Sequence, residues 1–400
     1  MLMIPAEKCI GRHQGGSYIS GMDRNYEVTV VGCGGLGSAA LYRLSRELER
    51  SVLGLEQFRL GHDRVASQDH SRIIRLAQHQ SEYATLAPHA YESWYEVEDE
   101  SGVRLLLTTG GLVIEAPDER DPEKVGTRNV DGYVAAFEEH GFDYELLDPD
   151  ALMARWPQFR LEGSERAIFQ KDSGLVDARK ANAVHVALAR GAVVLEETPV
   201  RAVRPNGEGV EVVTDGRTYL ADRVVITGDA WTNGVLQETG TRIPLTVTQE
   251  KVTYYATPNL KAFSPERFPV FMWHGADNFY GFPVYGEVAT KLGQHMGGLA
   301  KPVTAETRTF DPDPIRIERY RDFLERPRGQ LRHPGRRLRS PRPARLHPHG
   351  HPERRQDRPR TARVLAQLLR QHAPWPRQDV CPAIPTLGFG PPKRPCQILR

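Results

Sequence analysis

The hexapeptide Gly32-Cys33-Gly34-Gly35-Leu36-Gly37 decides the fold of this 400-residue chain. An apolar run that ends at Val31 precedes it, and a helical pattern over residues 38–49 leads from it into a second apolar run that ends at Glu56. A strand, a glycine turn, a helix and a second strand closed by an acid form the βαβ unit that binds dinucleotides. The alternative is an accidental glycine-rich turn in another α/β domain.

Each glycine of this turn has its own mechanical reason. Gly32 permits the tight turn, Gly34 lets the backbone approach a pyrophosphate, and Gly37 lets the helix lie close to the strand. The phosphates then lie at the helix N-terminus. Glu56 follows Gly37 by 19 positions, where a carboxylate is expected to bind a ribose hydroxyl. These four residues predict a dinucleotide site.

Two arginines follow in the segment Ser71-Arg72-Ile73-Ile74-Arg75. If this segment turns helically, both guanidinium groups project from similar faces, because residues three apart are neighbours on a helix. One arginine then meets the cofactor and the other a substrate carboxylate, which Arg binds with a two-pronged fork. The alternative is surface salt bridging.

The chain then alternates between helical and strand patterns. Gly228 and Trp231 follow one predicted strand and form a second glycine turn whose backbone amides can face a cofactor. The fold class is therefore α/β, with a Rossmann-like nucleotide-binding domain that an inserted segment interrupts. Helices are expected over residues 82–100, 130–140 and 178–189, and strands over residues 105–115, 169–176, 193–196, 210–214, 224–227 and 243–255.

Residues 279–292 predict a hairpin-rich sheet that contains Tyr280 and leads into the run Lys291-Leu292-Gly293-Gln294-His295. On a strand, Lys291 and His295 share one face. An ammonium and an imidazole that point together into a cleft can serve electrostatic or substrate-binding roles. The alternative is a solvated face of the sheet.

The sequence as a whole argues against a membrane-spanning, a secreted or a metal-binding protein. It contains no run of 18 apolar residues that would span a membrane. The segment before Tyr26 does not resemble a secretory signal, and the four cysteines lack metal-ligand spacing and indicate reduced thiols. We therefore expect a cytoplasmic protein, or a peroxisomal one in a eukaryotic host, with no metal and no membrane partner.

Residues 327–400 differ in composition from the rest. They contain 16 Arg and one Lys against three acids, a net charge of +14, so the other 326 residues carry −12. Such an Arg- and Pro-rich segment cannot bury enough apolar area to offset chain entropy, so disorder is the default expectation. Arg-rich segments can bind nucleic-acid phosphates, and His347, His349 and His351 can bind a metal. The preferred hypothesis is a frame-shifted reading of a GC-rich gene.

The order and spacing of these stretches resemble the flavoprotein family that includes monomeric sarcosine oxidase, N-methyltryptophan oxidase and pipecolate oxidase. The resemblance covers about residues 26–324. It rests on the glycine turn and on six further stretches: Leu53-Gly54-Leu55-Glu56-Gln57-Phe58, Ser71-Arg72-Ile73-Ile74-Arg75, Thr109-Gly110-Gly111-Leu112, Gly228-Asp229-Ala230-Trp231, Tyr280-Gly281-Phe282-Pro283 and Lys291-Leu292-Gly293-Gln294-His295.

The resemblance implies FAD rather than NAD, and oxidation of a secondary or cyclic amino acid to an imine while O2 is reduced to hydrogen peroxide. It implies that Lys291 lies beside the flavin, where its positive charge stabilises superoxide as it forms. Arg75 matches a residue that helps bind the substrate carboxylate, and Arg72 matches one close to the flavin. Tyr280 and His295 match residues that line the substrate pocket.

The same resemblance implies further cofactor-binding residues and the partners of the protein. The cofactor-binding residues that it implies are Gly32, Gly34, Gly37, Glu56, Ser71, Arg72, Val200, Gly228 and Trp231. The expected partners are a small amino-acid substrate and O2, with no nucleic acid, and we expect a monomer.

The resemblance stops near residue 326. Family members continue with a Cys-x-Tyr segment whose cysteine bonds to the flavin, and with a Gly-His-Gly-Phe-Lys stretch. Neither occurs here, and Cys381 and Cys396 match nothing, so no covalent link to the flavin is assigned. If residues 327–400 are frame-shifted, the cofactor domain lacks strands, a sheet edge is unpaired, and little activity is expected.

The predicted domain organisation follows from these matches. A flexible extension occupies residues 1–25, an FAD-binding domain residues 26–105 and 165–240, and an antiparallel-sheet substrate domain residues 106–164 and 241–326. The Arg/Pro-rich tail occupies residues 327–400. Two alternatives to an active oxidase stay open: an inactive or non-enzymatic flavin-binding remnant of the family and, less favoured, a nucleic-acid-binding protein with a basic tail.

Overall fold

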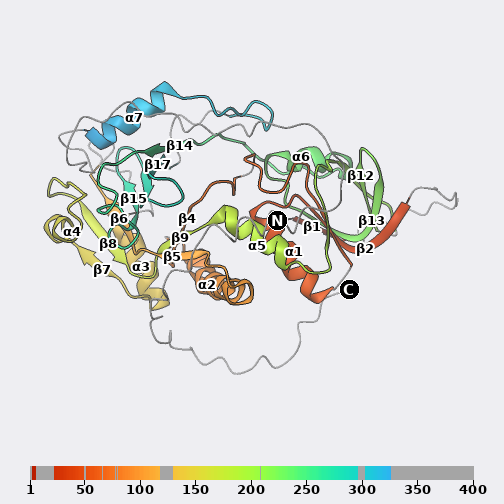
Figure 1. Ribbon diagram of the computed structural model, residues 1–400, viewed down its shortest axis with the longest axis horizontal. Coiled ribbons are helices and arrows are strands. Elements are labelled where there is room, and N and C mark those ends of the chain that lie inside the picture. Colours follow the sequence, from red (N-terminus) through yellow and green to blue (C-terminus); the bar gives the residue numbers. More distant parts are fainter. Residues whose placement is uncertain are drawn as a thin grey trace. The chain divides into compact units, whose positions relative to one another are not determined.

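The computed structural model describes residues 2–5, 22–48, 51–64, 66–76, 78, 80–117, 129–207, 209–295 and 302–325. All of them belong to one compact unit, Met1–His349. Two seven-stranded sheets and a three-stranded sheet form its framework (Figure 1). No helix among the described residues is long and apolar enough to cross a membrane.

The first sheet contains the glycine-turn unit. Its strand order is β10-β3-β2-β13-β12-β11. Strands β10, β3, β2 and β13 run parallel to one another, β12 is antiparallel to β13, and β11 is antiparallel to β12. Strand β1 pairs antiparallel with β13. The strands are β1 (Leu2–Pro5), β2 (Met22–Val31), β3 (Val52–Leu55), β10 (Val193–Leu195), β11 (Val200–Pro205), β12 (Val210–Thr214) and β13 (Thr218–Ile226).

The three central parallel strands end at the same edge of this sheet. Val31 pairs with both Leu55 and Ile226, so Gly32, Glu56 and the turn after β13 lie next to one another at the carboxyl ends. Ligands bind at this edge in open α/β sheets. The Rossmann-like fold that the sequence predicted is therefore confirmed.

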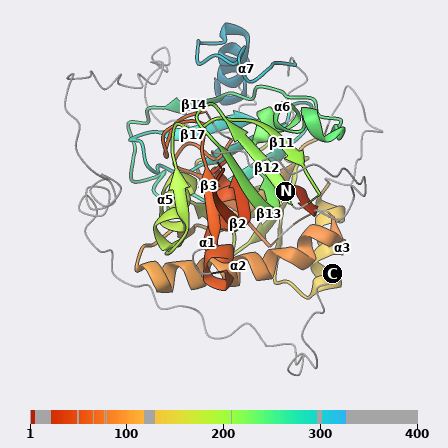
Figure 2. The same cartoon turned by 90° about the vertical axis from the view of Figure 1, so that its right-hand side faces the viewer.

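Helices cover this sheet with apolar faces. Helix α1 (Gly35–Glu47) contacts β2 and β3 and lies against α5 (Ala178–Leu188), as Figure 2 shows. Helix α2 (Ser81–Ser101) contacts α5 and also α3 (Val130–His140), which packs on the second sheet. Burial of α1 against β2 and β3 fixes its N-terminus directly after the glycine turn.

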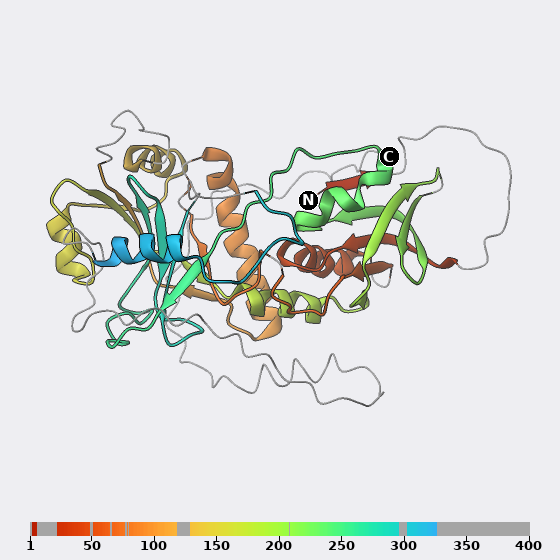
Figure 3. The same cartoon turned by 90° about the horizontal axis from the view of Figure 1, so that it is seen from above.

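The second sheet has the order β14-β17-β16-β15-β6-β8-β7 and is antiparallel except for the pair β15 and β6. Helices α4 (Pro149–Arg155) and α7 (Pro314–Glu325) contact it, and Figure 3 shows α7 beside its strands. The strands are β6 (Gly111–Glu115), β7 (Glu145–Leu147), β8 (Arg166–Gln170), β14 (Val252–Tyr255), β15 (Val270–His274), β16 (Phe279–Phe282) and β17 (Thr290–Gln294).

Shorter elements connect the two large sheets. Strands β4 (Arg72–Ile74), β9 (Gly174–Val176) and β5 (Leu106–Thr108) form the three-stranded sheet. After β13, the chain forms two 3-10 turns, η2 (Asp229–Trp231) and η3 (Gln237–Thr239), on either side of α6 (Thr232–Val235). The helix that follows the second glycine turn, α6, is therefore only four residues long.

Several elements differ from the sequence predictions. Residues 2–5 and 22–25, expected in a flexible extension, lie in β1 and β2, because both pair with β13. Only residues 252–255 of the predicted strand 243–255 are extended in a sheet. Strand β8 (Arg166–Gln170) pairs in the second sheet, although the boundary predicted at residue 165 assigned it to the cofactor domain. The Arg/Pro-rich tail lies outside the described residues.

Candidate functional site

The glycine turn fills a space that admits no side chain. Gly32 has a φ of +91°, which favours glycine, and a Cβ there would lie 2.7 Å from the Thr227 carbonyl oxygen. A Cβ on Gly37 would lie 1.8 Å from the Gly32 carbonyl oxygen. The close approach of α1 to β2 and β13 therefore depends on both glycines.

The N-terminus of α1 is open to an anion. Gly34 is the N-cap and has no side chain with which to cap the helix, and the first turn holds no acid. The Gly35 amide donates to Ser67 Oγ at 2.9 Å, so the loop after β3 reaches this helix end. Unsatisfied amides and the helix dipole favour a phosphate at such a position.

The Glu56 carboxylate is buried beside the glycine turn. It accepts hydrogen bonds from the backbone amides of Cys33 (2.9 Å) and Phe58 (3.1 Å), and His62 Nε2 lies 3.3 Å from Oε1. Burial acts to raise its pKa, but His62 and the two amides hold the pKa below its ordinary value. These contacts use three of about four acceptor positions of a carboxylate, which leaves one for a ribose hydroxyl.

The second glycine turn lies at the same edge of the sheet. The Thr227 hydroxyl donates to the Gly32 carbonyl at 2.7 Å, which joins Gly228 to the first turn. The Trp231 ring packs edge-on against Phe58, with centroids 5.6 Å apart. Val200 begins β11 and packs against the core of the first sheet, two residues after Thr198, whose amide donates to the Glu56 carbonyl.

Together these residues fit a dinucleotide. They form a glycine-rich turn, a helix N-terminus with glycine as its N-cap, and a buried acid with one acceptor position left, all at the carboxyl ends of parallel strands. Seven of the nine residues predicted to bind the cofactor lie at or beside this edge, and their contact with a cofactor stays a prediction: Gly32, Gly34, Gly37, Glu56, Val200, Gly228 and Trp231.

The loop before β4 leads from the glycine turn to Arg72. The Ala66 amide donates to Asp229 Oδ2 at 3.3 Å, which anchors the loop to the second glycine turn. The Arg72 guanidinium donates to the carbonyls of Ala66, Gln68 and Ser71. Arg72 therefore holds the conformation of this loop, and its contact with the cofactor stays a prediction.

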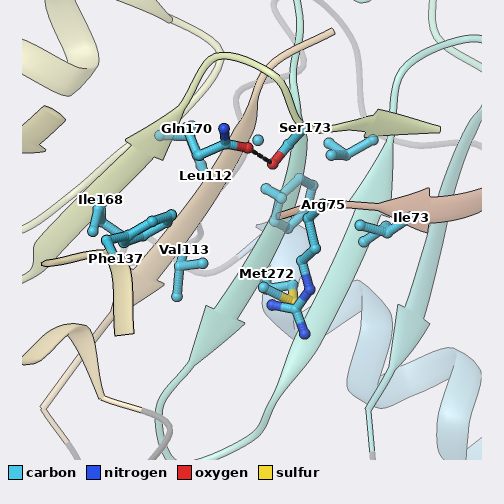
Figure 4. A pocket seen from close by; sticks show the side chains of 12 residues that line it. Ile73, Arg75, Leu112, Val113, Phe137, Ile168, Gln170, Ser173 and Met272 are labelled. Atoms are coloured by element: carbon cyan, nitrogen blue, oxygen red, sulfur yellow. Dashed lines mark hydrogen bonds between the residues drawn. The ribbon is translucent and has the colours of Figure 1, made fainter. Parts of the chain in front are cut away.

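Arg72 and Arg75 point in different directions. The segment forms strand β4 (Arg72–Ile74) rather than a helical turn, so the condition for a shared face is not met. Arg75 donates to the Tyr133 hydroxyl at 2.9 Å and to Gln78 Oε1 at 3.2 Å. It lines a small hollow of about 10 Å³, room for roughly one water molecule, where its guanidinium lies near Val113 and Met272 (Figure 4).

Lys291 is buried on β17 and bonds to the end of the same loop. Its ammonium donates to the Ser71 carbonyl at 2.9 Å and lies 3.3 Å from Ser71 Oγ, and its Nζ lies 4.7 Å from the Phe282 ring centroid. Asp69 Oδ2 lies 2.7 Å from Nζ. Burial lowers the pKa of Lys291 to about 8, although Asp69 acts to raise it.

Tyr280 and His295 lie on the same sheet face as Lys291. Tyr280 pairs with Gly293 across β16 and β17, and a Cβ on Gly293 would lie 2.4 Å from the Tyr280 ring. His295 is exposed, and its ring contacts Tyr280 edge-on at a centroid distance of 6.5 Å. Burial raises the pKa of Tyr280 to about 12, so its hydroxyl is a neutral hydrogen-bonding group at physiological pH.

The structure thus brings most predicted residues into two neighbouring groups. The glycine turns form one group, and Ser71, Arg72 and Lys291 form the other, with the loop before β4 between them. Arg75 faces its own hollow, whose lining residues include neither Tyr280 nor His295. The sequence interpretation missed Asp69 and Tyr254, because an acid in a polar loop and a tyrosine in a strand carry no local signal.

Comparison with known proteins agrees with this geometry. The family described as FAD dependent oxidoreductase matches residues 27–358. The chain belongs to this family. Monomeric sarcosine oxidase from Streptomyces avermitilis is 32% identical over 297 residues, which cover 72% of this chain and 74% of that protein. Peroxisomal sarcosine oxidase from Homo sapiens is 30% identical over 296 residues, 72% of this chain and 73% of that protein.

A solved structure has the same fold. The open form of NikD, described as an unusual amino acid oxidase essential for nikkomycin biosynthesis, matches with a TM-score of 0.66 at 25% identity and covers 77% of this chain and 78% of that chain. FAD is therefore the cofactor of this oxidoreductase. Cys33 is buried and burial raises the pKa of its thiol, so it is not a reactive anchor. Cys381, Cys396, His347, His349 and His351 lie outside the described residues.

Proposed function

We propose that this chain oxidises a secondary or cyclic amine of an amino acid to an imine and passes the electrons to O2, which becomes hydrogen peroxide. The observation that carries the proposal is the buried Lys291 ammonium on β17, held against Ser71 beside Arg72. The loop that bears Ser71 also contacts both glycine turns. The names of the sarcosine oxidase relatives support the same class of substrate.

FAD, when bound, supplies the two-electron chemistry, and the chain supplies position and charge. Lys291 carries a proton at neutral pH because its pKa is about 8. A positive charge in a buried site stabilises the negative charge that develops on oxygen as it accepts electrons. Arg72 adds a second positive charge next to the same carbonyl.

Arg75 is the proposed carboxylate clamp. Its contacts with Tyr133 and Gln78 use two of five guanidinium donors, so others can reach a ligand in the hollow. The walls of this hollow are mostly apolar, and because it has room for only about one water molecule, it must widen before a substrate enters. Tyr280 and His295 would line the substrate pocket on the Lys291 side. No general base is required if the amine arrives unprotonated.

The test begins with the purified full chain. A flavin absorption spectrum is expected, and denaturation with acid should release the flavin because no cysteine anchor is assigned. Peroxide should then form with sarcosine, pipecolate or an N-methyl amino acid in an assay coupled to peroxidase. A colourless protein would contradict the proposal. A yellow protein that forms no peroxide with any of these amines would favour the flavin-binding remnant.

A further inference from the structure

Asp69 occupies a backbone position that suits glycine. Its φ is +88°, in the left-handed region that few side chains adopt, and it ends the polar loop before β4. The Asp69 side chain is nevertheless only 11% exposed. An acid kept in such a conformation needs compensating interactions of its carboxylate.

The Asp69 carboxylate joins three parts of the chain. Its Oδ2 lies 2.7 Å from Lys291 Nζ on β17 and 3.9 Å from Arg72 Nη1 on β4. Its Oδ1 accepts hydrogen bonds from the Tyr254 hydroxyl on β14 and from the His70 amide, at 2.5 and 2.7 Å. Both oxygens are therefore engaged.

Two cations approach each other at this point. Lys291 Nζ and Arg72 Nη1 both donate to the Ser71 carbonyl, at 2.9 and 2.7 Å. The Lys291 side chain is 3% exposed, so water screens this repulsion poorly. The Asp69 carboxylate is the counter-charge that permits both cations to remain.

We propose that Asp69 is a positioning residue for Lys291. The Asp69 carboxylate holds the Lys291 ammonium against Ser71 and keeps it protonated at neutral pH. The assignment of Asp69 to Lys291 rests on the contacts alone. Its consequence for oxygen reduction rests on the proposed function.

Burial and Arg72 both act to lower the pKa of Lys291, and Asp69 acts in the opposite direction. Burial raises the pKa of Asp69, but Lys291, Tyr254 and the His70 amide hold it below its ordinary value, so the carboxylate is charged at neutral pH. The titratable or charged groups that face the pair or its partners are Arg72, Tyr254, His70, Tyr280 and Glu287.

The direct test measures the titration of Lys291 itself. Protein labelled with ¹³C-lysine is titrated by NMR, and the Lys291 signal is assigned from its absence in a Lys291→Met variant. Asp69→Asn keeps the side-chain shape without the charge, and Asp69→Gly also removes the strained side chain at φ +88°. In both variants the midpoint should fall by about one to three pH units.

Asp215→Asn is the matched control. Asp215 forms an exposed ion pair with Arg201 at 2.6 Å on the first sheet, so its loss should leave the Lys291 midpoint unchanged. Asp69→Gly relieves the backbone strain but leaves the buried Lys291 ammonium without its counter-charge, so thermal unfolding of both Asp69 variants shows that they are folded before the titration. A Lys291 midpoint equal to that of the wild type in both folded Asp69 variants would overturn the proposal.

A second measurement separates this proposal from the proposed function. Flavin is reduced by light without substrate, mixed with O2, and its reoxidation is followed at several pH values. The reoxidation rate should fall at high pH as Lys291 loses its proton. The pH at which it falls should be lower in both Asp69 variants and unchanged in Asp215→Asn. If the Lys291 midpoint moves while the reoxidation profile does not, the role of Asp69 stands and the oxygen-activating role of Lys291 fails.

Discussion

The glycine-turn site and the Lys291 cluster (Asp69, Ser71, Arg72 and Lys291) are built by different means, although the loop before β4 contacts both. The first is assembled from a contiguous stretch, residues 32–56, whose function depends on backbone conformation and the absence of side chains. The second joins side chains as far apart as Ser71 and Lys291, 220 positions away along the chain. A local motif can be recognised from its spacing, whereas a charge cluster exists only after the sheets have formed.

This difference predicts different consequences of substitution. Changes in the turn act through steric clash and therefore affect folding and cofactor binding together. Changes in the cluster act through charge, so they alter a rate or a titration while the flavin remains bound.

The largest effect is expected for Gly37→Ala. The new Cβ would meet the Gly32 carbonyl oxygen at 1.8 Å, so the helix must move away from the turn. We expect a loss of about 3 kcal/mol in the free energy of unfolding and no bound FAD. Urea unfolding and flavin content measure both effects.

Gly234→Ala in α6 is the matched control, because a Cβ there meets nothing within 4 Å. It should retain flavin and wild-type stability. Normal FAD binding by Gly37→Ala would refute the close-packing account of the turn.

The second-largest effect is expected for Lys291→Met, on the rate at which O2 reoxidises the reduced flavin. Removal of the ammonium should slow flavin reoxidation by about 100-fold, the usual cost of losing one stabiliser of developing negative charge. Flavin reduction by substrate should change far less. Stopped-flow measurement of the two half-reactions decides this, and equal losses in both would contradict the role of Lys291.

The same variant leaves the Asp69 carboxylate buried without its partner. The protein should therefore lose stability, and adding Asp69→Asn should restore part of it because the unpaired charge is gone. Reoxidation should remain slow in the double variant. Recovery of the rate would show that the single variant acted through misfolding.

The third effect concerns Glu56→Gln. The Gln side chain keeps one acceptor oxygen and replaces the other by an NH2 donor, so either the Cys33 or the Phe58 amide loses its acceptor, and FAD affinity should fall by about tenfold. Equilibrium binding to the apoprotein measures this change. Glu238→Gln is the control, because Glu238 pairs with Arg204 at an exposed position of the same region.

The stability difference between wild type and Glu56→Gln should depend on pH. The pKa of Glu56 is lower in the folded chain than its ordinary value of 4.5, so the carboxylate stabilises the fold above that value. This contribution is lost as pH falls through the folded pKa. Thermal unfolding over a pH series should therefore show the full difference at neutral pH and a difference that shrinks as the pH falls below 4.5.

The smallest effect is expected for Tyr254→Phe. The variant removes one hydrogen bond to Asp69 and leaves the ion pair with Lys291 in place. Reoxidation should change by about threefold or less, since one hydrogen bond contributes little net free energy. A change as large as that of Lys291→Met would mean that Tyr254 itself takes part in the reaction.

The sequence predicted the parts of the structure that short-range patterns determine. The glycine turn, Glu56, α3 and α5 have the expected places because spacing and periodicity define them. The β4 strand was not predicted, since its pairing with β9 comes from residues about 100 positions later along the chain. Asp69 was missed for a related reason: its partners lie on β17 and β14, and only tertiary structure brings them together.

The pH dependence of flavin reoxidation in the wild-type protein tests the central claim most directly. Lys291 carries its proton below a pKa of about 8 and loses it above, so the rate should be highest below that pH and fall as pH rises through it. Lys291→Met, with flavin still bound, should be slow and lack this step. A wild-type rate that does not change across this range, or the same step in Lys291→Met, would contradict the account.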